Sequence, residues 1–77
     1  MPVFFFDIDD GSGLVRDTEG SPHDDLSAAH REAVDTLSQI GRDVLTPKDD
    51  TEIVIEIRDE AGNALMRASL KLTSVRL

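Results

Sequence analysis

Five carboxylates near the start of the chain are the residues whose spacing could bind a metal ion. Asp7, Asp9 and Asp10 precede a Gly-Ser-Gly turn and Asp17 and Glu19 follow it, so a hairpin would bring them together. Hard cations such as Ca²⁺ take about six to eight oxygen ligands from such clusters. Counted from Asp7, however, the sixth position is serine and the twelfth is threonine, so the EF-hand signature is absent. Aspartates beside glycine are also typical turn formers that accept hydrogen bonds from nearby amides.

The two histidines and the hydroxyl side chains do not form a recognisable catalytic set. His23 and His30 are seven residues apart, not the four that place two ligands on one helical face. Ser27, His30 and Asp35 include the residue types of a hydrolase triad, but no strained nucleophile turn accompanies them. We expect His23 to lie in solvent and His30 to cover the edge of a helix. The sequence therefore predicts no enzyme activity and no cofactor.

The charges are distributed asymmetrically along the chain. The formal net charge is −8; residues 1–25 contain seven acids and one base, whereas residues 51–77 contain four of each. A field of this sign repels phosphate backbones, which argues against nucleic-acid binding. It favours either a basic protein partner or simply an acidic, soluble surface.

The length and the absence of cysteine limit what can stabilise the fold. Seventy-seven residues are near the lower limit for a self-sufficient core, and without cysteine there is no disulfide and no thiolate metal site. We expect a single domain over residues 1–77, supported by assembly into a homo-oligomer such as a dimer. No signal-peptide pattern and no membrane-spanning apolar run are evident, so we expect a cytoplasmic protein with no membrane contact.

A helical period dominates the middle of the chain. Six apolar residues recur at spacings of three and four, namely Leu26, Ala29, Ala33, Leu37, Ile40 and Val44. Asp24 or Asp25 is suited to cap the N-terminus of this helix, and Pro47 is expected to stop it. Gly41 is expected to weaken its last turns. The pattern predicts one amphipathic helix at about residues 25–45.

The remaining apolar segments alternate with the period of β-strands. Strands are predicted at residues 2–9, 14–17, 52–58 and 64–73. Turns at 10–13 and 59–63 would make two antiparallel hairpins, while 18–23 form a polar connection and 46–50 a polar linker. The predicted fold class is α+β, a two-layer ββαββ domain in which the sheet packs on the helix. The sheet residues expected to face the helix are Phe4, Phe6, Ile8, Ile53, Ile55, Ile57, Met66, Leu70 and Leu72.

All three aromatic residues lie side by side in the first strand. Alternation places Phe4 and Phe6 toward the helix and Phe5 on the opposite face, where Val3 and Val54 are the other apolar residues. One helix covers only one face, so Phe5 is expected to lack a cover within the domain. A buried phenylalanine contributes about 2 kcal/mol or more. Val3, Phe5 and Val54 are therefore the predicted interaction site, and a small exposed apolar spot is the alternative.

The motifs at both ends resemble one family. Phe4-Phe5-Phe6-Asp7-Ile8-Asp9-Asp10-Gly11 is similar to the aromatic-Phe-Phe-x-Ile-x-Asp-Gly opening of small domains of unknown function that are frequent in rhizobia and related alphaproteobacteria. The Asp17-Thr18-Glu19-Gly20 turn, the alanine-rich helix and the closing Asp59-Glu60-Ala61-Gly62 turn extend the resemblance over nearly the whole chain. Asp7 departs from it, since many members carry histidine there. The resemblance implies the same ββαββ fold and no activity.

These observations predict a small acidic interaction or structural module. It would self-associate through the sheet face or edge near Phe5. Two alternatives stay open: an acidic regulator that binds a basic partner, and a weak divalent-cation-binding domain. Both would use an acidic patch of Asp9, Asp10, Asp17 and Glu19.

Overall fold

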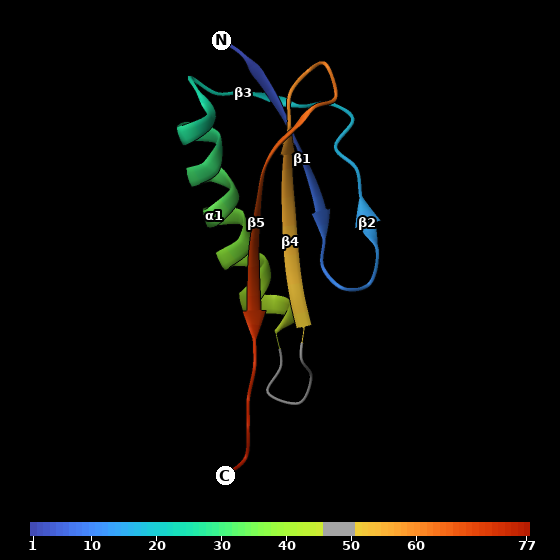
Figure 1. Ribbon diagram of the computed structural model, residues 1–77, viewed down its shortest axis with the longest axis vertical. Coiled ribbons are helices and arrows are strands. Elements are labelled where there is room, and N and C mark those ends of the chain that lie inside the picture. The colour runs from blue at the N-terminus through green and yellow to red at the C-terminus, as the bar shows by residue number, and fades with distance from the viewer. Residues whose placement is uncertain (46–50) are drawn as a thin grey trace.

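One helix packs on one face of an antiparallel sheet in the computed structural model, which describes residues 1–45 and 51–77 (Figure 1). The elements are β1 (Val3–Asp9), β2 (Leu14–Val15), β3 (Ser21–Pro22), α1 (Leu26–Val44), β4 (Thr51–Arg58) and β5 (Ala64–Leu72). The strand order is β2-β1-β4-β5, and β3 pairs with the beginning of β1. The α+β class predicted from the sequence is confirmed.

A short strand that the sequence pattern did not predict lies in the polar connection at residues 18–23. In this strand, β3, Ser21 pairs with Phe4 and Pro22 pairs with Val3. The sheet therefore has five strands, one more than the predicted ββαββ order, and β2 is shorter than predicted. A Ser-Pro strand has no alternation of apolar residues, and proline is tolerated there because the strand lies at a sheet edge.

The helix has the predicted extent. Asp25 caps it, because its carboxylate Oδ1 accepts a hydrogen bond from the amide of Ala28 at 2.9 Å. The helix ends at Val44, and the amide of Leu45 still donates to the carbonyl of Gly41 at 3.1 Å. The predicted stop at Pro47 and the predicted linker at 46–50 lie outside the described residues.

The hydrophobic core lies between α1 and the central strand β4. Its buried residues are Phe4, Ala29, Ala33, Leu37, Ile53, Ile55 and Ile57. Half-buried apolar residues surround it, namely Phe6, Ile8, Leu26, Ile40, Val44, Leu45, Met66 and Ala68. Leu70 packs on α1 as predicted, with its Cδ2 against Gly41, but β5 is an edge strand and leaves Leu70 36 % exposed.

Gly41 has a packing role that its helix propensity does not reveal. It is buried, and a Cβ atom at this position would lie 2.8 Å from Cδ2 of Leu70. The missing side chain therefore lets the last turns of α1 approach β5 closely, which offsets part of the cost of glycine in a helix.

Candidate functional site

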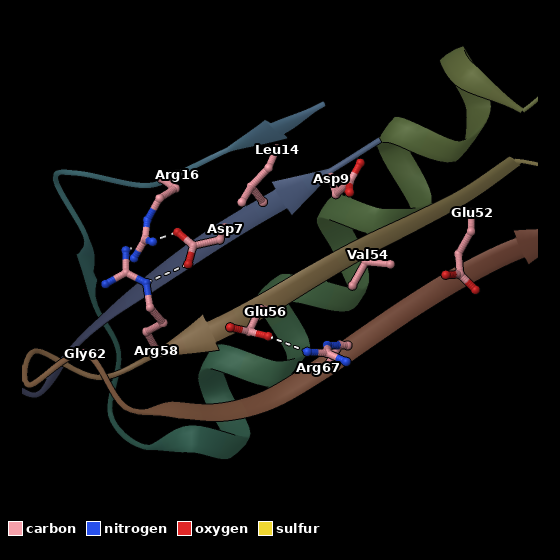
Figure 2. A pocket seen from close by; sticks show the side chains of 10 residues that line it. All are labelled: Asp7, Asp9, Leu14, Arg16, Glu52, Val54, Glu56, Arg58, Gly62 and Arg67. Carbon is pink, nitrogen blue, oxygen red and sulfur yellow. Dashed lines mark hydrogen bonds and ion pairs between the residues drawn. The ribbon is translucent and has the colours of Figure 1, made fainter. Parts of the chain in front are cut away.

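The sheet face opposite α1 is open and is the candidate functional site (Figure 2). It is hollowed into a groove of about 520 Å³. The groove is lined by Asp7, Asp9, Leu14, Arg16, Glu52, Val54, Glu56, Arg58, Gly62 and Arg67. Strand alternation explains why charges gather here, since every second residue of β1, β4 and β5 points away from the helix. The apolar contribution comes from Val54 and from Leu14, which is 61 % exposed.

A shielded ion pair between Asp7 and Arg58 lies at one end of this groove. Asp7 is 6 % exposed, and its Oδ2 and Oδ1 accept hydrogen bonds from Nε and Nη2 of Arg58 at 2.6 and 3.1 Å. Two residues from β1 and β4 thus form a bidentate contact across the sheet. Figure 2 shows Arg16 reaching toward the same carboxylate from the segment after β2.

Asp17 connects this ion pair to the N-terminal loop, which comprises residues 16–20 between β2 and β3. Its amide donates to Oδ1 of Asp7 at 3.0 Å, and its carbonyl accepts from Nη2 of Arg58 at 2.9 Å. Its carboxylate accepts hydrogen bonds from the amides of Phe6, Glu19 and Gly20 at 3.0–3.1 Å. Oδ2 of Asp17 therefore occupies the edge of β1 between β2 and β3, where it satisfies an amide that would otherwise face outward.

The pKa values of both aspartates lie below the ordinary value. The hydrogen bonds from Arg58 lower the pKa of Asp7, and they outweigh the opposing effect of burial. Burial raises the pKa of Asp17, but the amides of Gly20, Phe6 and Glu19 lower it further, so the net direction is downward. Both carboxylates are therefore charged at neutral pH.

These lowered pKa values predict a loss of stability in acid. A carboxyl group with a depressed pKa in the folded state stabilises the fold above its unfolded pKa of about 3.9, and this contribution disappears as the pH falls through the folded pKa. We expect the free energy of unfolding to fall below about pH 4. Urea unfolding at a series of pH values would measure this decrease, and Asp7→Asn should make it shallower. Asp35→Asn, at an exposed helix position, should leave the pH dependence unchanged; an equal effect of both variants would contradict the assignment.

Phe5 is half-buried against its own chain, so the prediction that it lacks a cover within the domain is wrong. The guanidinium carbon of Arg58 lies 5.0 Å from the centre of the Phe5 ring. Gly20 packs on the same side chain, since a Cβ atom there would lie 3.0 Å from the ring and 2.7 Å from Val3. The positive φ of 72° at Gly20 turns the loop back onto these two residues. The ring of Phe5 therefore packs against residues of the same domain.

The three predicted interaction residues do not form one patch. Val3 and Phe5 lie together beneath the N-terminal loop, whereas Val54 pairs with Asp9 at the other end of β1. Phe5 pairs with Arg58, so Asp7 and Glu56 lie between Phe5 and Val54 on this face. The edge beside Phe5 is also closed, by β3 and by the carboxylate of Asp17. Of the three, only Val54 lines the groove.

The predicted acidic patch is used largely for turn formation. Asp9 accepts a hydrogen bond from the amide of Gly11 at 2.9 Å, and Asp10 accepts two from Ser12, at 3.0 Å from its amide and 2.6 Å from its hydroxyl. Asp9 and Glu19 are exposed. Over residues 1–45 and 51–77, no group of three or more acidic, histidine or cysteine side chains is placed to hold a metal ion. The turn-former interpretation is therefore confirmed for Asp9, Asp10 and Asp17.

The histidines occupy unrelated positions. His23 is half-buried, and its ring lies 6.1 Å from that of Phe4 and 5.5 Å from that of Phe6, so the prediction that it lies in solvent is wrong. Its Nε2 is hydrogen-bonded to the hydroxyl of Ser21 at 3.0 Å. His30 is exposed on α1.

Sequence reasoning missed the Asp7–Asp17–Arg58 network. The pattern placed Asp7 correctly on the face away from the helix but offered no partner for it. One signal was available, because an aspartate between apolar residues of a strand needs a cation or several donors if it is buried. A second ion pair crosses the hairpin of β4 and β5, with Nη2 of Arg67 at 2.8 Å from Oε2 of Glu56.

Comparison with known proteins adds a family and nothing about activity. No helix in the described part of the chain is long and apolar enough to cross a membrane. No curated protein and no solved structure matches the chain. Residues 3–71 match the domain of unknown function DUF6894, and this range includes β1 through nearly all of β5. The chain therefore belongs to the DUF6894 family.

Proposed function

We propose that this protein is a small interaction module without a reaction of its own, which self-associates through the sheet face that α1 leaves uncovered. The observation that carries this proposal is the groove on that face, with exposed Leu14 and half-buried Val54 among its charged residues. A domain of this size has a small core, and covering a second sheet face is a direct way to add buried apolar surface. The proposed contact between copies lies at the groove, farther along β1 than Phe5.

The charges of the groove support a second copy as the partner. Two of its acids are already paired within the chain, Asp7 with Arg58 and Glu56 with Arg67. Among the described residues, Asp9, Glu52 and Arg16 line the same groove without an ion pair. In a twofold dimer each contact occurs twice, so Arg16 of one copy can meet Asp9 or Glu52 of the other.

The test is the mass of the protein in solution as a function of concentration. We expect light scattering after size exclusion to show a dimer whose fraction grows with concentration. Leu14→Glu should weaken the dimer by about tenfold or more, because it places a charge in the apolar part of the contact. Val34→Glu adds the same charge at a 47 % exposed site on α1 and should leave the dimer intact.

Two results would contradict this proposal. One is a monomer at every concentration, and the other is a dimer equally stable in Leu14→Glu and in the control. A monomer would favour the second candidate, a regulator that binds a basic protein. The exposed carboxylates of Asp9 and Glu19 and the net charge of −8 support that candidate.

A further inference from the structure

β5 is an open edge of the sheet, at the opposite side from the N-terminal loop. The strand order ends at β5, and no other described strand pairs with it on the side away from β4. Its nine residues run along the full length of β4 (Figure 1). The other edge is different, since β2, β3 and the Asp17 carboxylate close it. An open edge of this length presents unpaired backbone donors and acceptors that another strand can use.

The register identifies the residues whose backbone faces outward. The amide of Phe6 donates to Asp17, on the side of β1 away from β4, so Phe6 and Ile57 form a pair without mutual hydrogen bonds. The backbone of Ile57 therefore points toward β5 and bonds its partner Met66. The alternate residues of β5, namely Arg67, Ser69 and Lys71, then direct their amides and carbonyls away from the sheet.

The side chains of this edge carry one sign of charge. Residues 64–77 contain three bases and no acid, although the whole chain has a net charge of −8. Arg67 and Lys71 lie on the open face of β5, and both are exposed. Arg67 is paired with Glu56 of β4, but 69 % of its side chain still meets the solvent. On the helix side of the same strand, Leu70 is 36 % exposed. The edge thus presents bases on one face and an apolar side chain on the other.

We propose that β5 binds an extended acidic segment of a partner protein as an additional strand. Alternating side chains of such a segment would place carboxylates beside Arg67 and Lys71 and apolar groups beside Leu70. Backbone hydrogen bonds from Arg67, Ser69 and Lys71 would hold the segment, as in other cases of strand addition. A second copy of β5 is a poor occupant, because it would bring together two strands that carry only positive charge.

The first test uses a synthetic peptide that matches the length of β5, nine residues alternating glutamate and valine. Titration of this peptide, labelled with a fluorescent dye because neither partner contains tryptophan or tyrosine, should show binding that weakens as salt is added, since the pairs are exposed to solvent. A peptide with lysine in place of glutamate should bind at least about tenfold more weakly. Equal binding of the two peptides, or no binding of the acidic one, would overturn the proposal.

Two variants test the edge itself. Ser69→Pro removes an outward amide without removing a hydrogen bond to β4, and it should abolish binding while the helical circular dichroism is kept. Ser69→Ala keeps the amide and should bind normally. If Ser69→Pro does not fold, Arg67→Glu with Lys71→Glu provides the second measurement and should transfer binding to the lysine peptide.

The control for charge is Arg31→Glu with Arg42→Glu, at two exposed positions on α1. It changes the net charge by the same amount and should keep the preference for the acidic peptide. Loss of that preference in the control would show that net charge and not the edge selects the peptide, and its survival in the β5 double variant would show that Arg67 and Lys71 do not select it; either result would overturn the proposal. Self-association through the sheet face is tested by the mass in solution, and strand addition at β5 by peptide binding. The two proposals can therefore fail independently of each other.

Discussion

Asp7→Ala should lower the free energy of unfolding by about 2 to 3 kcal/mol. The replacement leaves the guanidinium of Arg58 without its carboxylate and the amide of Asp17 without its acceptor. Removing one partner of a shielded pair is costly because the remaining charge has lost both water and its counter-ion. The cost should be less than for a fully enclosed pair, since Arg58 borders the open groove. Urea unfolding monitored by circular dichroism would measure it.

The matched control is Glu56→Ala, which breaks the second ion pair of the same sheet. Arg67 in that pair is 69 % exposed, so the loss should be below about 1 kcal/mol. Asp7→Ala should also loosen the N-terminal loop, because Asp17 would lose one of its two hydrogen bonds to β1 and keep only the one from the amide of Phe6. Faster amide exchange at Glu19 and Gly20 would report this. If both alanine variants lost the same stability, the Asp7 network would not be the structural link assigned to it.

Ile57→Ala should cost about 3 to 4 kcal/mol of unfolding free energy. Ile57 is fully buried in β4, and its cross-strand neighbours are Phe6 on β1 and Met66 on β5. Truncation removes apolar contacts and leaves a cavity that two neighbouring strands and the helix must close. A domain of this size has a total stability on the order of 5 kcal/mol. The variant should therefore be largely unfolded at moderate urea concentration.

Val54→Ala is the control on the opposite face of the same strand. Val54 is half-buried at the groove, so its truncation should cost about 1 kcal/mol or less. Chemical unfolding of both variants would compare the two faces of β4 directly. A loss for Val54→Ala as large as that for Ile57→Ala would mean that the groove face is part of the folding core.

The elements with strong periodicity were predictable from the sequence. The helix at Leu26–Val44 and the hairpin of β4 and β5 follow from repeated apolar spacings and from turns rich in aspartate and glycine. Their bounds differ from the prediction by one residue at each end or less. Hydrogen bonds between residues close in sequence were also predictable, as the helix cap at Asp25 and the aspartate turns show. These features depend on neighbours within a few positions of the chain.

Contacts between distant segments were not predictable in the same way. β3 carries no alternating pattern, and it forms because Gly20 and Asp17 return the chain to β1. The cover over Phe5 comes from Arg58, fifty-three positions later in the chain. The composition does not distinguish Arg58 from the other lysine and arginine residues as the partner of this ring. The register of β1 and β4 does, because it pairs Phe5 with Arg58.

The sequence by itself therefore determined a one-helix α+β domain with a surplus aromatic residue and an acidic N-terminal part. The hydrophobic period and the formation of turns depend on residues that are close together in the sequence, so both can be predicted from the sequence alone. The tertiary structure decided which edge is closed, which edge is open and which charges are shielded. Those properties depend on strand order and register, because pairing residues far apart in the chain determines which backbone groups and side chains still meet the solvent.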